Sequence, residues 1–191
     1  MTAEPIYKAL PANYPSEWIE TVTLAGGETV TIRPILPGDA PRLQEGFTHL
    51  SSESIYYRFL DTARQLSDKQ AHQLANLDYL LQMAMVASIV EENEERLVGV
   101  ARYVLVGEKE PGAAETAVVV RDDFQGRGLG ILLYERLIRY ARQHGVKYFT
   151  GTIHQSNAKV MKFIRKSGLH FEREMIEPGV FLVRIYLDLP V

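Results

Sequence analysis

Residues 118–130 have the sequence Val118-Val119-Val120-Arg121-Asp122-Asp123-Phe124-Gln125-Gly126-Arg127-Gly128-Leu129-Gly130. The run of valines predicts a buried strand, and the apolar spacing after Gly130 predicts a helix. Glycines let the backbone of the connecting turn approach a ligand closely. The first amide N–H groups of a helix have no partner within the helix, and the helix dipole adds positive charge there. The stretch therefore predicts a cradle for a phosphate or pyrophosphate, to which Arg127 can add a charged contact.

Two familiar phosphate-binding motifs do not match this turn. A P-loop ends in Gly-Lys-Ser/Thr, whereas this turn ends in Gly128-Leu129-Gly130. A Rossmann fingerprint needs Gly-x-Gly-x-x-Gly, and its third glycine would fall on Ile131 or Leu133 in the two registers. The glycines alone leave open the alternative of a tight strand-to-helix turn that binds no ligand.

The pattern on either side of this stretch predicts one mixed sheet. Alternating and β-rich runs predict strands at residues 21–24, 28–36, 83–90, 97–106, 113–121, 146–153, 169–175 and 180–187. Helical spacing and capping residues predict helices at 39–49, in two segments of 50–80, at 130–143 and at 157–166. Asp39 is the expected cap of the first of these helices, and Ser67-Asp68 is expected to start the second segment of 50–80. This order predicts an α/β fold with helices on both faces of the sheet. We expect a single domain over residues 21–191, preceded by an arm, residues 1–20, that either docks through Tyr14 and Trp18 or is disordered.

Composition narrows the class of protein. The chain has 191 residues and no cysteine, which excludes a disulfide framework, a thiolate zinc site and a cysteine nucleophile. Its formal net charge of -3 argues against a general nucleic-acid-binding protein, because phosphate neutralisation needs clustered basic residues. No apolar run is long enough to span a membrane and no secretory signal is evident, so we expect a cytoplasmic protein. The histidines lack metal-binding spacing, and we expect no metal.

Two motifs give a resemblance to a known family. The turn Gln125-Gly126-Arg127-Gly128-Leu129-Gly130 resembles the Gln-x-x-Gly-x-Gly turn of the GNAT family of acyl-CoA-dependent N-acetyltransferases. The stretch Asn157-Ala158-Lys159-Val160-Met161-Lys162-Phe163-Ile164-Arg165-Lys166-Ser167-Gly168-Leu169 resembles the second motif of that family, an Asn-led helix that ends in Lys-x-Gly-Phe. Leu169 stands where the pattern has Phe. The resemblance implies the GNAT fold, a mostly antiparallel central sheet with helices on both faces, over about residues 22–187.

A closer resemblance extends toward the N-terminus. The segments Thr29-Val30-Thr31-Ile32-Arg33-Pro34-Ile35, Asp39-Ala40-Pro41 and Leu50-Ser51-Ser52-Glu53-Ser54-Ile55-Tyr56-Tyr57-Arg58-Phe59 are similar to the acetyltransferase domain of bacterial protein lysine acetyltransferases. In that group the domain is commonly fused to a synthetase-like or cyclic-nucleotide-binding domain, and we expect no such second domain within these residues. The resemblance implies acetyl-CoA as the acyl donor and a protein lysine as the acceptor. A small-molecule amine acceptor, a non-catalytic acyl-CoA-sensing module and a nucleotide-phosphate-binding protein that merely shares the turn are the alternatives.

The resemblance also assigns roles to individual residues. In the family, backbone groups of the fourth strand hold the pantetheine arm, amides of the turn hold the pyrophosphate, and the Asn contacts the pantetheine or the sulfur end. The implied cofactor-binding residues are Val118, Val119, Val120, Gln125, Gly126, Arg127, Gly128, Leu129, Gly130 and Asn157. For Asn157, capping of the helix that follows it is the alternative.

Glu115 is the candidate catalytic residue. It lies in an otherwise apolar predicted strand, where a buried carboxylate is costly without a partner. In the lysine acetyltransferases that the chain resembles, a glutamate at this place acts as general base. A lysine amine needs a base because its unperturbed pKa is about 10.4. We expect partial burial that raises the pKa of Glu115 toward neutrality, and the alternative is a solvated Glu115 in a salt bridge.

The usual position of a side-chain acid for the leaving thiolate is not occupied by one here, so the alternatives are protonation by water and departure as the thiolate. Many family members carry a Tyr seven residues after the motif Asn as general acid, and here that position is Ile164. Tyr134 is a candidate substitute, although we favour a packing role for it. His154 follows a predicted strand and either relays a proton or caps a loop, the latter being favoured. Arg33 and Arg58 are expected to form structural ion pairs.

Overall fold

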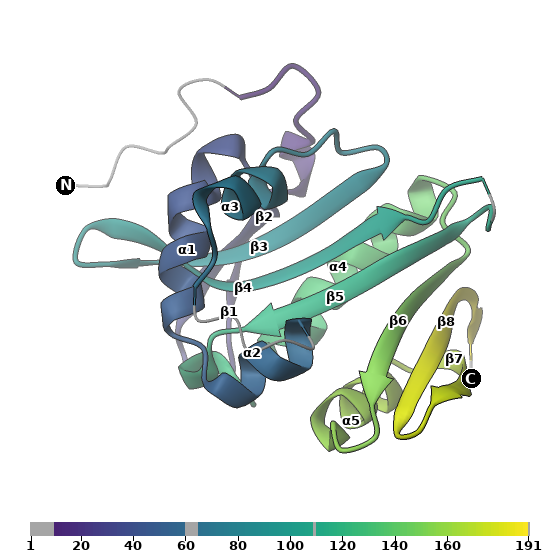
Figure 1. The fold of residues 1–191 in the computed structure, drawn as a ribbon. Helices are drawn as coiled ribbons and strands as arrows, with labels where there is room; N and C mark the ends of the chain where they lie inside the picture. The colour runs from purple at the N-terminus through teal and green to yellow at the C-terminus, as the bar shows by residue number, and fades with distance from the viewer. Residues whose placement is uncertain (1–9, 60–64, 109, 191) are drawn as a thin grey trace.

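An eight-stranded sheet runs through the molecule (Figure 1). The computed structural model describes residues 10–59, 65–108 and 110–190. The strands are β1 (Glu20–Thr23), β2 (Thr29–Pro34), β3 (Gln82–Glu91), β4 (Glu94–Leu105), β5 (Ala113–Val120), β6 (Tyr148–His154), β7 (Leu169–Glu177) and β8 (Val180–Pro190). They lie in the order β1-β2-β3-β4-β5-β6-β8-β7, and every neighbouring pair is antiparallel except β5 and β6. The predicted mixed, mostly antiparallel sheet is confirmed.

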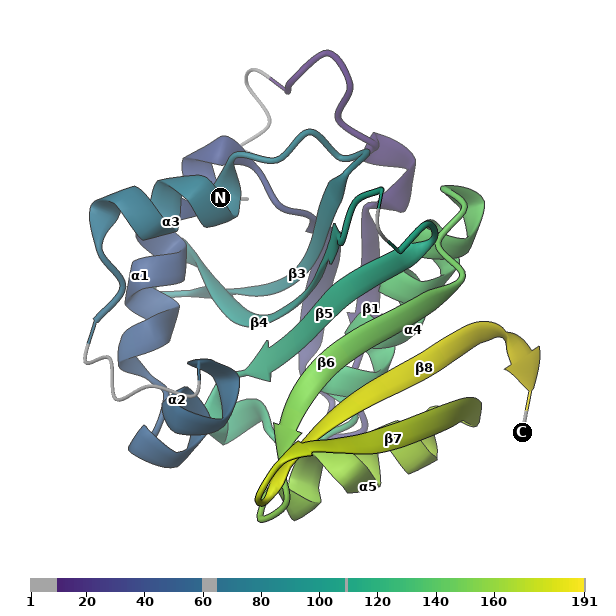
Figure 2. The ribbon, with the colours of Figure 1, turned by 45° about the vertical axis from the view of Figure 1, so that its right-hand side comes forward.

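Helices pack on both faces of this sheet, as predicted. They are α1 (Ala40–Thr48), α2 (Ser52–Phe59), α3 (Asp68–Ala75), α4 (Leu129–Gln143) and α5 (Ala158–Lys166), with short 3-10 helices η1 (Ser16–Trp18), η2 (Pro37–Asp39) and η3 (Asp122–Phe124). α1 and α3 cover one face over β3 and β4, whereas α4 and α5 lie against the opposite face (Figures 1 and 2). The described helices leave the α1 side of β6, β8 and β7 uncovered.

The uncovered side of β5, β6, β8 and β7 is called the open face. Strand register places Glu115 opposite Thr150, Thr150 opposite Arg184, and Arg184 opposite Glu172. Directly opposed residues on neighbouring strands project from the same face of a sheet, so these four side chains form one row across four strands. The open face therefore begins at Glu115 and extends to the edge strand β7.

Local signals account for the ends of several elements. Gly27 has φ of +90° in the predicted first hairpin, where a left-handed residue is needed. Glu92 and Asn93 both have positive φ, the requirement of a two-residue type I′ turn between β3 and β4. Ser67 caps α3 by accepting a hydrogen bond from the Gln70 amide, as the sequence predicts.

The prediction that Asp39 caps α1 with its side chain is wrong. Asp39 occupies the cap position without a side-chain cap bond, and its carboxylate instead accepts two hydrogen bonds from Arg33, at 2.7 and 2.8 Å. Arg33 is fully buried and also donates to Glu95 at 3.0 Å, which confirms its predicted structural ion pairing. A buried guanidinium must be paired, and that need outweighs the cap. The side chain of Arg58 lies outside the described residues.

The described part of the N-terminal segment, from residue 10, packs against the core. The Tyr14 ring is buried and its hydroxyl donates to the Pro34 carbonyl at 2.8 Å. The Trp18 ring meets Tyr140 of α4 edge-on, with ring centroids 5.3 Å apart. Both aromatic residues thus dock this segment on the sheet and α4, and β1 follows directly from it.

Candidate active site

β5 and β6 form a fork at the centre of the sheet. They are parallel neighbours, but their paired register covers only Ala113–Glu115 against Tyr148–Thr150. Beyond Glu115, β5 continues to pair with β4, and β6 continues to pair with β8, so the two strands separate toward their C-terminal ends. Figures 1 and 2 show this divergence. The fork exposes backbone groups that a continuous sheet would pair.

The backbone of Val118 faces into this fork. Arg121 N donates to Val98 O, and Val106 N donates to Ala113 O, so the odd-numbered residues of β5 turn their backbone groups to β4. Alternation along a strand then directs both groups of Val118 toward β6, where no paired register reaches them in the described residues. Val119 faces β4, and the Val120 carbonyl accepts a hydrogen bond from the Gln125 side chain at 3.1 Å. Of the three valines, Val118 therefore offers the most to a ligand.

The glycine-rich turn leads from η3 into α4. Gly126 and Gly128 have φ of +77° and +87°, and a Cβ added at either would meet no atom within 4 Å. Backbone conformation, rather than crowding, thus requires glycine at both positions. At Gly130, by contrast, a Cβ would touch Phe163 and Val120 at 3.5 Å.

The start of α4 has free donors above this turn. Gly128 is the N-cap residue and supplies no side-chain cap, and the first i to i−4 bond of the helix runs from Leu132 N to Gly128 O. The amide N–H groups of Leu129 to Ile131 therefore point out of the helix end, where the dipole is positive. Open space, free amides and a positive end together fit an anion, as the sequence predicts for this segment.

The two polar side chains of the turn are held by their neighbours. The Arg127 guanidinium pairs with Glu28 of the first hairpin and lies over the Phe124 ring, 4.9 Å from its centroid. Gln125 Nε2 donates to Asp122 at 3.1 Å and to the Ser54 hydroxyl at 3.2 Å. Gln125 thus braces the turn, and Arg127 is placed beside it with its charge partly neutralised.

Glu115 stands at the point where the fork opens. It is the last residue of β5 that is paired with β6, and its side chain is exposed on the open face. The expectation of partial burial is therefore wrong, because the described helices do not cover this part of β5. The described residues form no hydrogen bond or ion pair with its carboxylate, so the alternative salt bridge is not observed either. An accessible carboxylate remains free to accept a proton.

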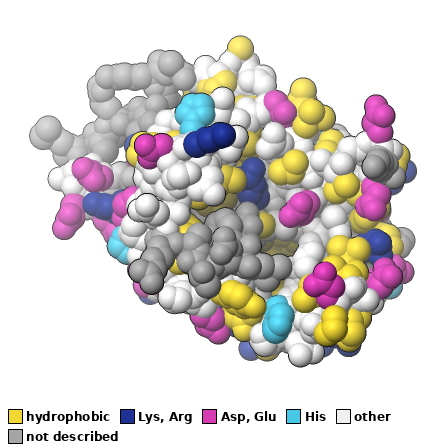
Figure 3. Space-filling view, in the orientation of Figure 1, with side chains coloured by type: hydrophobic (Ala, Val, Ile, Leu, Met, Phe, Trp, Pro, Cys, Tyr) yellow, Lys and Arg dark blue, Asp and Glu magenta, His cyan; other side chains and the backbone are white. Residues whose placement is uncertain are grey.

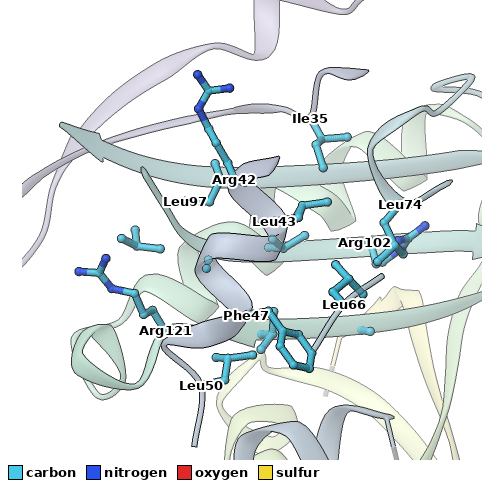
Figure 4. Close-up of a pocket in the computed structure, with 16 residues that line it drawn as sticks. Ile35, Arg42, Leu43, Phe47, Leu50, Leu66, Leu74, Leu97, Arg102 and Arg121 are labelled. Atoms are coloured by element: carbon cyan, nitrogen blue, oxygen red, sulfur yellow. The ribbon is translucent and has the colours of Figure 1, made fainter. Parts of the chain in front are cut away.

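A cavity of about 80 Å³ lies between α1 and the sheet, on the same side as Glu115 (Figure 4). Apolar side chains of α1 and β4 line it, together with Ala117 and Val119 of β5. In Figure 4 the guanidinium groups of Arg42 and Arg121 point away from its centre. Pockets that enclose small ligands measure roughly 300–1,000 Å³, so this cavity is too small to hold a whole acceptor molecule.

The start of α5 lies at the other arm of the fork. Asn157 Oδ1 accepts a hydrogen bond from Val160 N at 3.0 Å, so Asn157 is a helix cap. Its side-chain amide N–H groups have no partner among the described residues, which leaves them available to a ligand. His154 Nδ1 lies 2.7 Å from the Ser156 hydroxyl, the predicted loop-capping arrangement. Ile164 is buried.

Tyr134 is a packing residue in this structure. Its ring lies between those of Phe149 and Phe163, with centroid separations of 5.6 and 5.1 Å. Burial raises the pKa of Tyr134, which makes the hydroxyl a poorer proton donor. The favoured packing role is confirmed.

Comparison with known proteins identifies the family. A model of the acetyltransferase (GNAT) family matches residues 51–169. The chain belongs to the GNAT acetyltransferase family. It is 37% identical over 130 residues to Acetyltransferase PA5475 of Pseudomonas aeruginosa, a match that covers 68% of each chain. It is 32% identical over 169 residues to Acetyltransferase Pat of Mycolicibacterium smegmatis, covering 88% of this chain and 48% of Pat, so it spans about half of that relative.

A solved structure gives the same result for the GNAT fold. The GNAT domain of S. lividans PAT has a TM-score of 0.81 and 30% sequence identity, over 91% of this chain and 99% of that one. The predicted GNAT fold and the predicted class, an N-acetyltransferase, are confirmed. Within the described ranges, none of the helices has the length and apolar character that a bilayer crossing requires. The same residues contain no group of three or more histidine and acidic side chains suited to a metal ion.

Proposed function

We propose that this GNAT enzyme transfers an acetyl group from acetyl-CoA to a protein lysine, with Glu115 as the general base. The observation that carries the proposal is the position of Glu115 at the fork, between the exposed backbone of β5 and the open face. The donor would approach along β5, and the acceptor would approach from the open face.

The residues present fit the acetyl-CoA donor. Its pyrophosphate would lie on the free amides at the start of α4, from Gly126 to Gly130, with Arg127 beside them. Its pantetheine amides would bond the Val118 backbone, with Val119 and Val120 adjacent, and its sulfur end would lie near Asn157. Bound acetyl-CoA would supply a thioester carbonyl carbon. An open cradle, the unpaired backbone groups of Val118 and a free side-chain amide are the complementary features that support this fit.

Glu115 has the access that a general base needs. An acceptor lysine arrives as ammonium, since its unperturbed pKa is about 10.4, and it must lose a proton before its nitrogen can attack. The exposed carboxylate takes that proton and passes it to water. Exposure also allows the side chain to meet a lysine on the surface of a large acceptor.

The open face favours a protein acceptor over a small amine. The cavity beside β5, of about 80 Å³, is smaller than the pockets of roughly 300–1,000 Å³ that enclose small ligands, which supports an acceptor bound on the open surface. The row that begins at Glu115 carries two glutamates and one arginine, Arg184, and Glu174 lies on the same face two residues beyond Glu172 on β7. Acidic side chains are spread over the right-hand half of this face (Figure 3). An accessible acidic surface complements a lysine within a basic region of a folded protein.

Glu115→Gln tests the catalytic assignment. We expect thiol release from acetyl-CoA in the presence of a lysine-rich protein mixture to fall by roughly 10²–10⁴-fold, the typical contribution of a general base. Acetyl-CoA affinity, measured by calorimetry, should stay within about twofold of the wild-type value. Glu108→Gln is the matched control, since it removes an exposed carboxylate from the loop between β4 and β5 and should retain activity. Full turnover in Glu115→Gln would refute the assignment.

The acceptor panel separates the remaining alternatives. Thiol release that depends on the protein mixture supports a protein lysine, whereas release only with small amines supports a small-molecule acceptor. Tight binding of acetyl-CoA without transfer to any amine would favour an acyl-CoA-sensing module. Binding of ATP or NAD without CoA would exclude the donor altogether.

A further inference from the structure

α2 connects the two arms of the fork. On the β5 side, Asp122 accepts hydrogen bonds from the Ser51 amide at 3.2 Å and from the Ser54 hydroxyl at 2.8 Å. Gln125 of the glycine-rich turn also donates to the Ser54 hydroxyl, at 3.2 Å. These bonds fix the N-terminal end of α2 beside the end of β5. Figures 1 and 2 both show α2 beside the C-terminal end of β5.

On the β6 side, α2 contacts the loop that leads into α5. The Tyr57 hydroxyl lies 3.0 Å from the Ser156 hydroxyl and 3.3 Å from the Ser156 carbonyl oxygen. Glu53, one helical turn before Tyr57 on α2, forms an ion pair with Lys159 of α5 at 2.8 Å. Ser156 directly precedes Asn157, the cap of α5. The Tyr57 hydroxyl is therefore held at the open end of the fork, where the sulfur end of the donor is proposed to lie.

We propose that Tyr57 is a catalytic residue that donates its hydroxyl proton to the departing sulfur. The inference rests on the proposed function in its use of acetyl-CoA. Three observations support Tyr57 rather than another phenol. Its hydroxyl is partly exposed, it projects from the helix that spans the fork, and its bond to Ser156 is a neutral one that can exchange. Tyr134 is buried behind the sheet among aromatic rings and lacks that access.

The proton and electron balance of the step is closed. The bond from the lysine nitrogen to the carbonyl carbon forms, the bond from that carbon to sulfur breaks, and its electron pair stays on sulfur. Tyr57 gives one proton to sulfur, and the resulting phenolate recovers a proton from water. The nitrogen loses two protons in all, the first to Glu115 and the second to water. One ammonium and one thioester thus yield one amide, one thiol and one proton.

Charged groups from four parts of the chain lie around the segment that holds Tyr57. Glu53 lies on the same helix, Lys159 on α5, His154 at the end of β6, and Asp122 beyond the end of β5. Glu53 and Lys159 neutralise each other. The Ser156 hydroxyl lies between Tyr57 and His154 Nδ1, at 3.0 and 2.7 Å, and supports the orientation of the phenol.

The test measures binding of CoA and of desulfo-CoA, which lacks the thiol, by calorimetry between about pH 7 and pH 9. A free thiol has a pKa of about 8.5, so the thiolate form appears in this range. A hydrogen bond from Tyr57 favours the thiolate. In the wild-type protein the affinity ratio of CoA to desulfo-CoA should therefore rise about tenfold or more with pH, the usual strength of a hydrogen bond to a charged group. Tyr57→Phe should abolish that rise and lower kcat more than it changes KM.

Two matched variants separate catalysis from a structural role. Tyr56→Phe removes the neighbouring hydroxyl, which has no hydrogen bond among the described residues, and should behave as wild type. Glu53→Gln breaks the other contact of α2 with α5 and should also leave the pH-dependent ratio unchanged. If Tyr57→Phe does not fold, Ser156→Ala serves instead, and we expect it to reduce the rise by about threefold.

The outcomes distinguish this inference from the proposed function. If neither CoA nor desulfo-CoA binds, both are refuted. If both ligands bind and Tyr57→Phe keeps the wild-type rise, only the role of Tyr57 is refuted. An equal loss of the rise in Glu53→Gln would show that α2 acts as a structural connection, and would overturn the catalytic assignment as well.

Discussion

Substitution of the glycine at the start of α4 separates backbone strain from ligand binding. Gly128 has φ of +87° and Gly145, just beyond the C-terminus of the same helix, has φ of +78°. A Cβ at either position would meet no atom within 4 Å, so only the left-handed backbone opposes alanine. That conformation costs a non-glycine residue roughly 1–2 kcal/mol. At about 2–4 °C per kcal/mol for a protein of this size, both Gly128→Ala and Gly145→Ala should lower Tm by about 2–8 °C.

The two variants should differ in their affinity for CoA. The methyl group of Gly128→Ala would enter open space within the turn that is proposed to hold the pyrophosphate. Loss of one hydrogen bond to a charged group costs about 1.5–3 kcal/mol, which is roughly a 10–100-fold weaker Kd. Gly145→Ala places the same strain at the other end of the helix and should bind CoA as wild type does. Scanning calorimetry gives Tm, and titration calorimetry gives Kd.

The expected loss of CoA affinity and the expected loss of Tm are tested independently. Equal CoA affinities in Gly128→Ala and Gly145→Ala would show that the turn does not hold the phosphates. An unchanged Tm in both variants would show that the helix ends relax without strain, and the assignment of glycine to backbone conformation would be wrong.

Two further predictions concern the charges that hold the fold. Asp39→Ala leaves the buried Arg33 guanidinium without its bidentate partner and should lower the free energy of unfolding by about 3–5 kcal/mol, measured by urea denaturation; a change below about 1 kcal/mol would contradict the pairing. Hydrogen bonds from Arg121 hold the pKa of Glu91 and of Asp123 below their ordinary values. Because these folded-state pKa values are lowered, the pairs add stability at neutral pH that is lost as the pH falls below about 4.5. Arg121→Met should therefore flatten the slope of unfolding free energy against pH between about pH 5 and pH 3, and an unchanged slope would refute the coupling.

The sequence predicts the parts of the site that depend on local conformation. The glycine-rich turn and the start of α4 are evident because left-handed positions require glycine and because helical periodicity begins at once. The place of Glu115 on its strand is equally local. Its exposure is not, since the burial of a strand residue depends on which helix covers that face. Ala113 and Ala114, which precede Glu115 on β5, are buried, whereas the side chain of Glu115 faces solvent.

Long-range contacts explain most of what the sequence does not predict. Tyr57 and Ser156 are 99 residues apart, and no local pattern relates a tyrosine in α2 to a serine before α5. A family resemblance singles out the segment that contains Tyr57 without giving its position in space. Asp39 shows the same limit, because its cap position is evident from sequence whereas its bond to buried Arg33 depends on how η2 packs against β2.

The fork itself follows from how its two strands are held. β5 pairs with β4 over seven residues and β6 pairs with β8 over seven, whereas β5 and β6 share only three paired positions. Each arm is thus anchored by an antiparallel neighbour, and closing the gap would require breaking one of those longer ladders. A ligand that binds the exposed backbone at Val118 does not have to separate strands first. The free-energy cost of rearranging the sheet on binding is therefore small. α2 spans the open end of the fork, and its contacts with the two arms are exposed hydrogen bonds and one surface ion pair. Such contacts are individually weak, about 1 kcal/mol or less for the exposed pair, so the shape of the fork depends on its ladders rather than on α2.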